Sequence, residues 1–135
     1  MTDKISKEQR SANMRAVRSR NTRPETRVRQ IAHGLGYRFR LNRRELPGKP
    51  DIAFPGRRKV IFVHGCFWHQ HKGCRRASLP QSNYDFWLTK LAHNVERDAE
   101  QLAAIRKLGW RVLVVWECEI KNERRLAARL RRFLQ

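Results

Sequence analysis

Two runs of β-branched and apolar residues, separated by a long helical segment, restrict the folds open to this chain more than any other feature. The runs are 59–64 (Lys-Val-Ile-Phe-Val-His) and 110–116 (Trp-Arg-Val-Leu-Val-Val-Trp). Uninterrupted runs of this kind are typical of central buried strands. Between them a helix is expected from about Tyr84 to Leu108, with Gly109 as its stop. The order strand, long helix, strand indicates one mixed α/β sheet with helices on its faces.

Shorter elements precede this unit. Thr22-x-x-Glu25 has the form of a capping box, and the apolar residues after it recur at helical spacing, so an amphipathic helix is expected to end near Gly36. Residues 37–41 alternate apolar and basic side chains, which predicts a half-buried strand. A turn over residues 46–50 leads into a short strand at 51–54.

The start of the long helix and the C-terminal segment each show a pattern typical of a helix. Ser82-x-x-Asp85 is a second candidate cap, placed just before the long helix. Residues 122–134 predict a basic helix whose apolar stripe includes Leu126 and Leu130. The predicted fold class is therefore α/β, a single domain with a mixed central sheet flanked by helices.

The net charge of the chain indicates which class of partner it binds. The 135 residues include 31 Lys and Arg against 12 Asp and Glu, a formal net charge of +19. An excess of this size favours a polyanion as partner. No apolar run approaches the length of about 20 residues that a membrane span requires, and residues 1–20 do not have the pattern of a secretory signal. A cytoplasmic, monomeric protein directed to nucleic acid is expected.

The composition separates an N-terminal basic segment, residues 1–20, from a single domain at residues 21–135. Residues 1–50 hold 14 basic and 4 acidic side chains, and few apolar residues interrupt those before position 21. One interpretation is a solvated helix with little contact to the core. The other is a basic arm laid on phosphates.

The three cysteines and one histidine have the composition of a metal site. Cys66-x4-His71-x2-Cys74 places three soft or borderline ligands in nine residues, and Cys118 follows the second strand run. If the two strands are parallel neighbours, their ends bring Cys118 next to Cys66. Three thiolates and one imidazole would then form a closed tetrahedral site suited to structural zinc. Ordinary free cysteines in a reducing compartment are the alternative.

Other polar residues stand where α/β sheets commonly place ligands. Asp51 opens a strand, and such a carboxylate can hold Mg²⁺, although an Asp after Pro is more often only a turn residue. His64 and His69 flank Cys66 and are not needed by a zinc site, so they are either structural or catalytic. Along the long helix three polar residues recur every fourth position and share one face, from which the last could orient His69. These residues are Lys90, Asn94 and Asp98.

Phe67 and Trp68 are adjacent bulky aromatics in a polar loop. They either belong to the core or form a wedge that enters between base pairs. A mispair lowers the cost of unstacking, so a wedge favours damaged or mispaired sites.

Five segments resemble motifs of the very short patch repair (Vsr-type) DNA mismatch endonucleases. The resemblance extends from about Ser11 to Cys118, with the motifs in the same order. The segments are Asn13-Met14-Arg15-Ala16, residues 46–51 (Leu-Pro-Gly-Lys-Pro-Asp), residues 61–69 (Ile-Phe-Val-His-Gly-Cys-Phe-Trp-His), residues 94–98 (Asn-Val-Glu-Arg-Asp) and residues 109–118 (Gly-Trp-Arg-Val-Leu-Val-Val-Trp-Glu-Cys).

This resemblance implies a core related to the restriction endonucleases and a strand-specific nick beside the thymine of a T·G mispair. It also implies Mg²⁺ for the chemistry, a structural zinc, duplex DNA and mismatch-repair factors as partners, and a place at the nucleoid in the bacterial cytoplasm. The implied catalytic residues are Asp51, His64, His69, Asp98 and Glu25.

The resemblance also implies individual roles. Asp51 and the backbone carbonyl of Val63 would hold Mg²⁺. His69 would be the base that activates water, and Asp98 would orient His69. The implied zinc ligands are Cys66, His71, Cys74 and Cys118. The implied DNA contacts are Phe67 and Trp68 as a wedge, Met14 entering from the N-terminal region, Lys90 and Asn94 on the face that reads the mispair, and Arg15.

Some residues depart from the family pattern. Gln70 and Lys72-Gly73 interrupt what can be a longer histidine run.

Two other functions stay open on the residues alone. A non-catalytic zinc-bearing DNA-binding module would explain the charge and the wedge, although not the set of acids and histidines. A restriction-type nuclease would cut matched DNA with a similar site.

Overall fold

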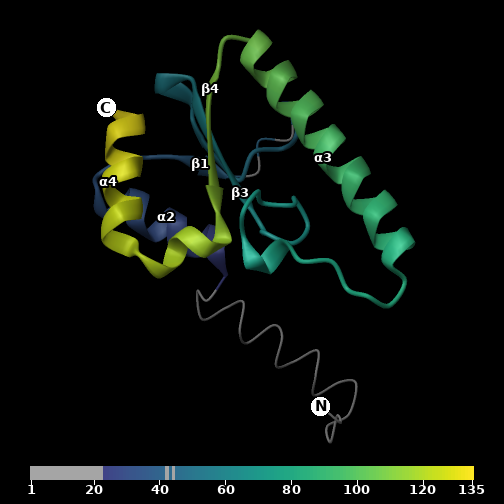
Figure 1. Ribbon diagram of the computed structural model, residues 1–135. Coiled ribbons are helices and arrows are strands. Elements are labelled where there is room, and N and C mark those ends of the chain that lie inside the picture. The colour runs from purple at the N-terminus through teal and green to yellow at the C-terminus, as the bar shows by residue number, and fades with distance from the viewer. Residues whose placement is uncertain (1–22, 42, 44) are drawn as a thin grey trace, which may run out of the picture.

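A four-stranded sheet with the order β1-β2-β3-β4 forms the centre of the computed structural model, which describes residues 23–41, 43 and 45–135 (Figure 1). β1 (Arg40–Leu41) pairs antiparallel with β2 (Ile52–Phe54), and β2 pairs antiparallel with β3 (Lys59–His64). β3 and β4 (Arg111–Trp116) are parallel, in a register that begins at Lys59 beside Arg111 and ends at His64 beside Trp116. The mixed sheet expected from the sequence is confirmed.

Three helices of the described residues cover the two faces of this sheet. α3 (Tyr84–Lys107) crosses one face, and α2 (Pro24–Gly34) and α4 (Glu123–Leu134) lie together on the other (Figure 1). Short 3₁₀ turns connect these elements: η1 (Pro55–Arg57), η2 (Arg75–Ala77) and η3 (Glu117–Lys121). The result is a single three-layer α/β domain.

The alternation of side chains along the strands explains why both faces are covered. One set of strand residues packs with α2 and α4, and the intervening set packs against α3. The first core contains Val28, Ala32, Ile52, Phe54, Ile61, Val115, Leu126, Leu130 and Leu134. The second contains Leu46, Ala53, Val60, Phe62 and Ile105. Since both faces are apolar, the sequence of β3 is an uninterrupted hydrophobic run.

Several local predictions were wrong in detail. α2 has Arg23 rather than Thr22 in its N-cap position, whereas the expected stop at Gly36 is confirmed, since Gly36 follows the C-cap Leu35 at a φ of +92°. α3 is preceded by Asn83 in the left-handed conformation, without a side-chain cap hydrogen bond, rather than by Ser82. The strand expected over residues 37–41 is paired only at Arg40–Leu41, because its partner β2 has three residues and ends where η1 begins.

Some expectations concern residues outside those described. The basic arm at 1–20, with Met14 and Arg15, is among them. Within the described residues, no helix is both long enough and apolar enough to span a bilayer.

Candidate active site and metal centre

The parallel pairing of β3 and β4 determines where the candidate site forms. Because His64 lies beside Trp116 at the end of the register, Cys66 and Cys118 each follow two residues beyond the same edge of the sheet. Glu117 strengthens this junction, since its Oε1 accepts a hydrogen bond of 3.2 Å from the N–H of Cys66. The long-range neighbourhood expected for the two cysteines is therefore present.

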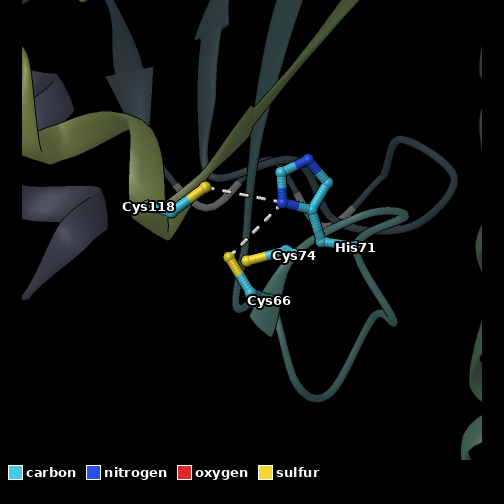
Figure 2. A group of neighbouring side chains, drawn as sticks. All are labelled: Cys66, His71, Cys74 and Cys118. Carbon is cyan, nitrogen blue, oxygen red and sulfur yellow. Dashed lines mark hydrogen bonds between the residues drawn. The ribbon is translucent and has the colours of Figure 1, made fainter. Parts of the chain in front are cut away.

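Figure 2 shows that the side chains of Cys66, His71, Cys74 and Cys118 converge on one point. Their ligand atoms all lie within 4.8 Å of one another, and the three cysteines are free thiols. His71 Nδ1 is 3.4 Å from the Cys118 sulfur and 3.7 Å from the Cys66 sulfur. This Cys/His cluster could hold a metal ion.

The thiols of the cluster differ in how readily they ionise. Burial, together with the neighbouring sulfurs, raises the pKa of the Cys66 thiol to about 12. A hydrogen bond from the backbone of Arg76 lowers the pKa of Cys74. A cation among these sulfurs would stabilise the thiolate at Cys66, which burial alone disfavours. The His71 ring is held flat against Trp116, with centroids 4.2 Å apart.

A second cluster lies on the α3 side of the same edge and consists of His64, His69 and Asp98. His69 Nδ1 is 2.6 Å from Asp98 Oδ2, which confirms the contact expected between the loop and α3. The His64 ring stacks on His69 at 3.8 Å between centroids and 6° between planes. Burial lowers the pKa of His64 to about 4, and the neighbouring His69 adds to the effect, so His64 is neutral at pH 7.

Asp51 approaches these histidines from the start of β2. Its Oδ2 accepts a hydrogen bond of 2.7 Å from the N–H of Val63, which fixes the carboxylate against the end of β3. Burial raises the pKa of Asp51, the Val63 N–H opposes this, and the nearby Glu25 carboxylate raises it further. Glu25 stands in the first turn of α2. Two acids and two imidazoles therefore share one region at the sheet edge.

Phe67 and Trp68 lie at the tip of the loop that follows β3. Trp68 is 49% exposed, whereas Phe67 is half-buried. Both rings pack edge-on against Trp87 of α3, at centroid distances of 5.5 and 5.9 Å. The loop therefore carries a supported aromatic cluster with Trp68 outermost, rather than residues buried in either sheet core.

The face of α3 that carries Lys90, Asn94 and Asp98 contacts this loop. Asn94 donates its Nδ2–H to the backbone carbonyl of Trp68 at 3.1 Å, one turn before Asp98 contacts His69. Lys90 is exposed one turn earlier on the same face. The structure thus brings α3 and the aromatic loop together at two successive positions.

Comparison with known proteins agrees with these features. Residues 2–76 match the family model described as DNA mismatch endonuclease Vsr. The chain is 55% identical over 134 residues to the type II nicking enzyme V.XorIIP of Xanthomonas oryzae pv. oryzae, covering 99% of this chain and 98% of that protein. It is 44% identical over 126 residues to the DNA mismatch endonuclease Vsr of Escherichia coli K12, covering 93% and 80% of the two chains.

The chain belongs to the DNA mismatch endonuclease Vsr family. It is therefore a nuclease by family. Another relative, the type II nicking enzyme V.NmeAIP of Neisseria meningitidis, is 42% identical over 135 residues, which cover 100% of this chain and 96% of that protein.

Sequence reasoning missed three residues of this Vsr-family site. Trp87 stands three positions before Lys90, so the helical spacing that grouped Lys90, Asn94 and Asp98 could have included it. Gln70, noted only as a departure from the family pattern, donates its side-chain amide to the carbonyls of Phe67 and Ala77, at 2.7 and 3.1 Å. The contact from Glu117 to Cys66 depends on tertiary structure and had no local signal.

Proposed function

We propose that this Vsr-family protein nicks one strand of duplex DNA beside the thymine of a T·G mispair and so initiates very short patch repair. It would act as a monomer in the bacterial cytoplasm, at the nucleoid and in company with mismatch-repair factors. The observation that carries the proposal is the His69–Asp98 pair, which stands beside His64 and Asp51 at the foot of an exposed aromatic loop.

His69 has the arrangement of a general base. Asp98 engages Nδ1, which favours the tautomer with the proton on that nitrogen and leaves the lone pair on Nε2. Nε2 can then take a proton from the water that attacks phosphorus, while Asp98 stabilises the resulting imidazolium. His64, neutral and stacked on His69, would keep this ring in place and would act on the phosphate side of the reaction.

The oxygen ligands at the sheet edge suit a hard cation. Asp51 and the backbone carbonyl of Val63 would hold Mg²⁺, which takes oxygen ligands and needs few from the protein. Bound Mg²⁺ would polarise the phosphodiester and stabilise the leaving oxygen. The N–H of Val63 orients the Asp51 carboxylate, and Glu25 supplies a second acid close to it.

The Cys/His cluster suits zinc. In a tetrahedral zinc site, sulfur and nitrogen ligands at ordinary bond lengths are about 3.5 Å apart. The two sulfur-to-Nδ1 distances at His71, 3.4 and 3.7 Å, agree with that value. Four protein ligands close the coordination sphere, so this zinc would be structural and would connect the loop after β3 to the end of β4.

The aromatic loop would provide mispair recognition. Phe67 and Trp68 would enter the base stack at the mispair, and a mispair lowers the cost of that entry. Lys90 and Asn94 would read the exposed bases from α3. Met14 would enter from the N-terminal region and Arg15 would hold phosphate there, both of them from residues outside those described.

The decisive assay is nicking of end-labelled duplexes that differ only in a central T·G or matched pair, with and without Mg²⁺. The proposal expects Mg²⁺-dependent cleavage of the T strand in the mispaired duplex alone. Asp51→Ala should bind this duplex and fail to nick it. Equal cleavage of matched DNA would indicate a restriction-type nuclease instead, and binding without nicking would indicate a non-catalytic DNA-binding module.

A further inference from the structure

The outer face of α4 and the last residue of η3 carry a group of cations. Five side chains are exposed there and project to the same side, around the small Ala128. This basic face of α4 comprises Lys121, Arg124, Arg125, Arg131 and Arg132. The opposite side of the helix is apolar and is buried through Leu126, Leu130 and Leu134.

This charge is concentrated on one side of the molecule. α4 has five arginines and one glutamate between Glu123 and Leu134. α3, twice as long, has four basic and four acidic residues and so carries no net charge from these side chains. Since the two helices cover opposite faces of the sheet, the positive charge of the helical layers gathers on the α4 side (Figure 1).

The acids near α4 do not neutralise its basic face. Glu123 is engaged by Arg27 of α2, with 2.7 Å between Arg27 Nε and Glu123 Oε1. Glu119 accepts two hydrogen bonds of 2.6 Å from Arg129, which lies to the side of the basic face. Across residues 23–41, 43 and 45–135, no cation of the basic face forms an ion pair with an acid.

The basic face begins beside the catalytic edge and leads away from it. α4 starts directly after η3, which contains Cys118, and runs towards the opposite end of the sheet (Figure 1). A hollow of about 430 Å³ between η3 and α4 is lined by residues of both regions, His71 and Cys118 from the Cys/His cluster and Lys121 and Arg125 from the basic face. Twelve helical residues span about 18 Å, which corresponds to about five base pairs of duplex.

We infer that the basic face of α4 is a second duplex-binding surface, which holds the phosphate backbone of DNA flanking the cleavage site. Arginine suits this task because its planar guanidinium binds phosphate oxygens through two hydrogen bonds. The face consists of cations without an aromatic side chain among them, so its contacts are to backbone phosphates and independent of base sequence. This inference rests on the proposed function and adds the flanking backbone to its substrate.

Two matched pairs of basic residues allow a test. Arg131→Gln/Arg132→Gln removes two charges from the last turn of α4, and Arg106→Gln/Lys107→Gln removes two from the last turn of α3. Duplex affinity of the full chain is measured over a range of KCl concentrations without divalent cations. One duplex is a single helical turn centred on the T·G pair, and the other extends for several turns on both sides.

On the long duplex, the double variant in α4 should make the negative slope of log K against log salt shallower by up to about 2. Each phosphate that the variant no longer neutralises accounts for about 0.9. The α3 pair should cause a smaller change, and on the short duplex the two variants should bind alike. Equal slopes for both variants on the long duplex would overturn the inference and leave the face to an acidic protein partner. If the wild type binds these duplexes but does not nick the T·G duplex once Mg²⁺ is added, the proposed function is refuted, and the slopes still decide the role of α4.

Discussion

The amide of Gln70 provides a sensitive test of how the aromatic loop is held. A primary amide has two N–H groups, and Gln70 lies where it can use both, towards the carbonyls of Phe67 and Ala77 at 2.7 and 3.1 Å. Its backbone is also in the left-handed region, at a φ of +48°. The backbone N–H of Gln70 also donates to the Phe67 carbonyl, and the side chain adds the hydrogen bond to Ala77 of η2.

Gln70→Glu keeps the shape of the side chain and removes both donors. Each hydrogen bond contributes about 0.5–1.5 kcal/mol net, so their loss costs about 1–3 kcal/mol. The ionised carboxylate would also face two carbonyl oxygens, so Gln70→Glu should destabilise the fold more than Gln70→Ala does. Neither change alters the backbone strain, because Ala, Glu and Gln share the same preference against a positive φ.

The assay is urea unfolding followed by circular dichroism and by the fluorescence of the four tryptophans, of which Trp68 and Trp87 lie in the aromatic cluster. Gln81→Glu is the matched control, since Gln81 is exposed and the substitution changes the net charge by the same amount. The expected order of stability is wild type and Gln81→Glu, then Gln70→Ala, then Gln70→Glu. Equal unfolding midpoints for Gln70→Glu and Gln81→Glu would refute the reasoning.

Three further outcomes follow from the geometry. Gly48→Ala should lower the free energy of unfolding in urea by about 2–4 kcal/mol, because φ is +75° and a Cβ would lie 3.0 Å from the Phe62 ring. Gly36→Ala is the control, since Gly36 has a φ of +92° and nothing within 4 Å of its Cβ position, and it should cost about 1 kcal/mol. Glu123→Gln should lower the Tm at pH 7 but not in acid, since the hydrogen bond from Arg27 lowers the pKa of Glu123 and its stabilisation is lost as pH falls through that pKa. Cys118→Ser should lower bound zinc, measured by atomic absorption, and reduce the Tm by about 10 °C, as should chelation of the wild type; unchanged melting would contradict a structural metal.

The sheet and the Cys/His cluster could be predicted from sequence for the same reason. The two apolar runs predicted strands whose parallel pairing would place Cys66 and Cys118 at one edge. The burial expected of both strands is confirmed for β3, whereas β4 is the last strand of the sheet and only Val115 in it is buried. The contact from His69 to Asp98 could also be predicted, because Lys90, Asn94 and Asp98 repeat every fourth residue and so define one face of α3. In each case a local pattern, either an apolar run or a repeat every fourth residue, indicated which residues would lie together.

What sequence could not supply depends on partners that are distant in the chain. β1 is two residues long because β2 ends after three, a limit set by the neighbour and not by the alternating pattern over residues 37–41. The N-caps of α2 and α3 use no side-chain oxygen, although Thr22 and Ser82 offered suitable ones. The role of Gln70 likewise exists only when the loop is folded.

The two clusters at the sheet edge lie on opposite sides of the end of β3. β3 ends at His64, which belongs to the cluster with His69 and Asp98 near α3, and the chain then continues into Cys66 of the Cys/His cluster beside η3. The sulfur-rich set is closed by four protein ligands, whereas Asp51 and Val63 offer oxygen atoms and leave room for water and phosphate. On the proposed function, an ion at the Cys/His cluster would stabilise the loop that carries His69 without taking part in proton transfer at His69 Nε2. Under that proposal, removal of the ion should displace His69 from Asp98 and lower nicking through this loss of position, while the chemistry of the base would be unchanged.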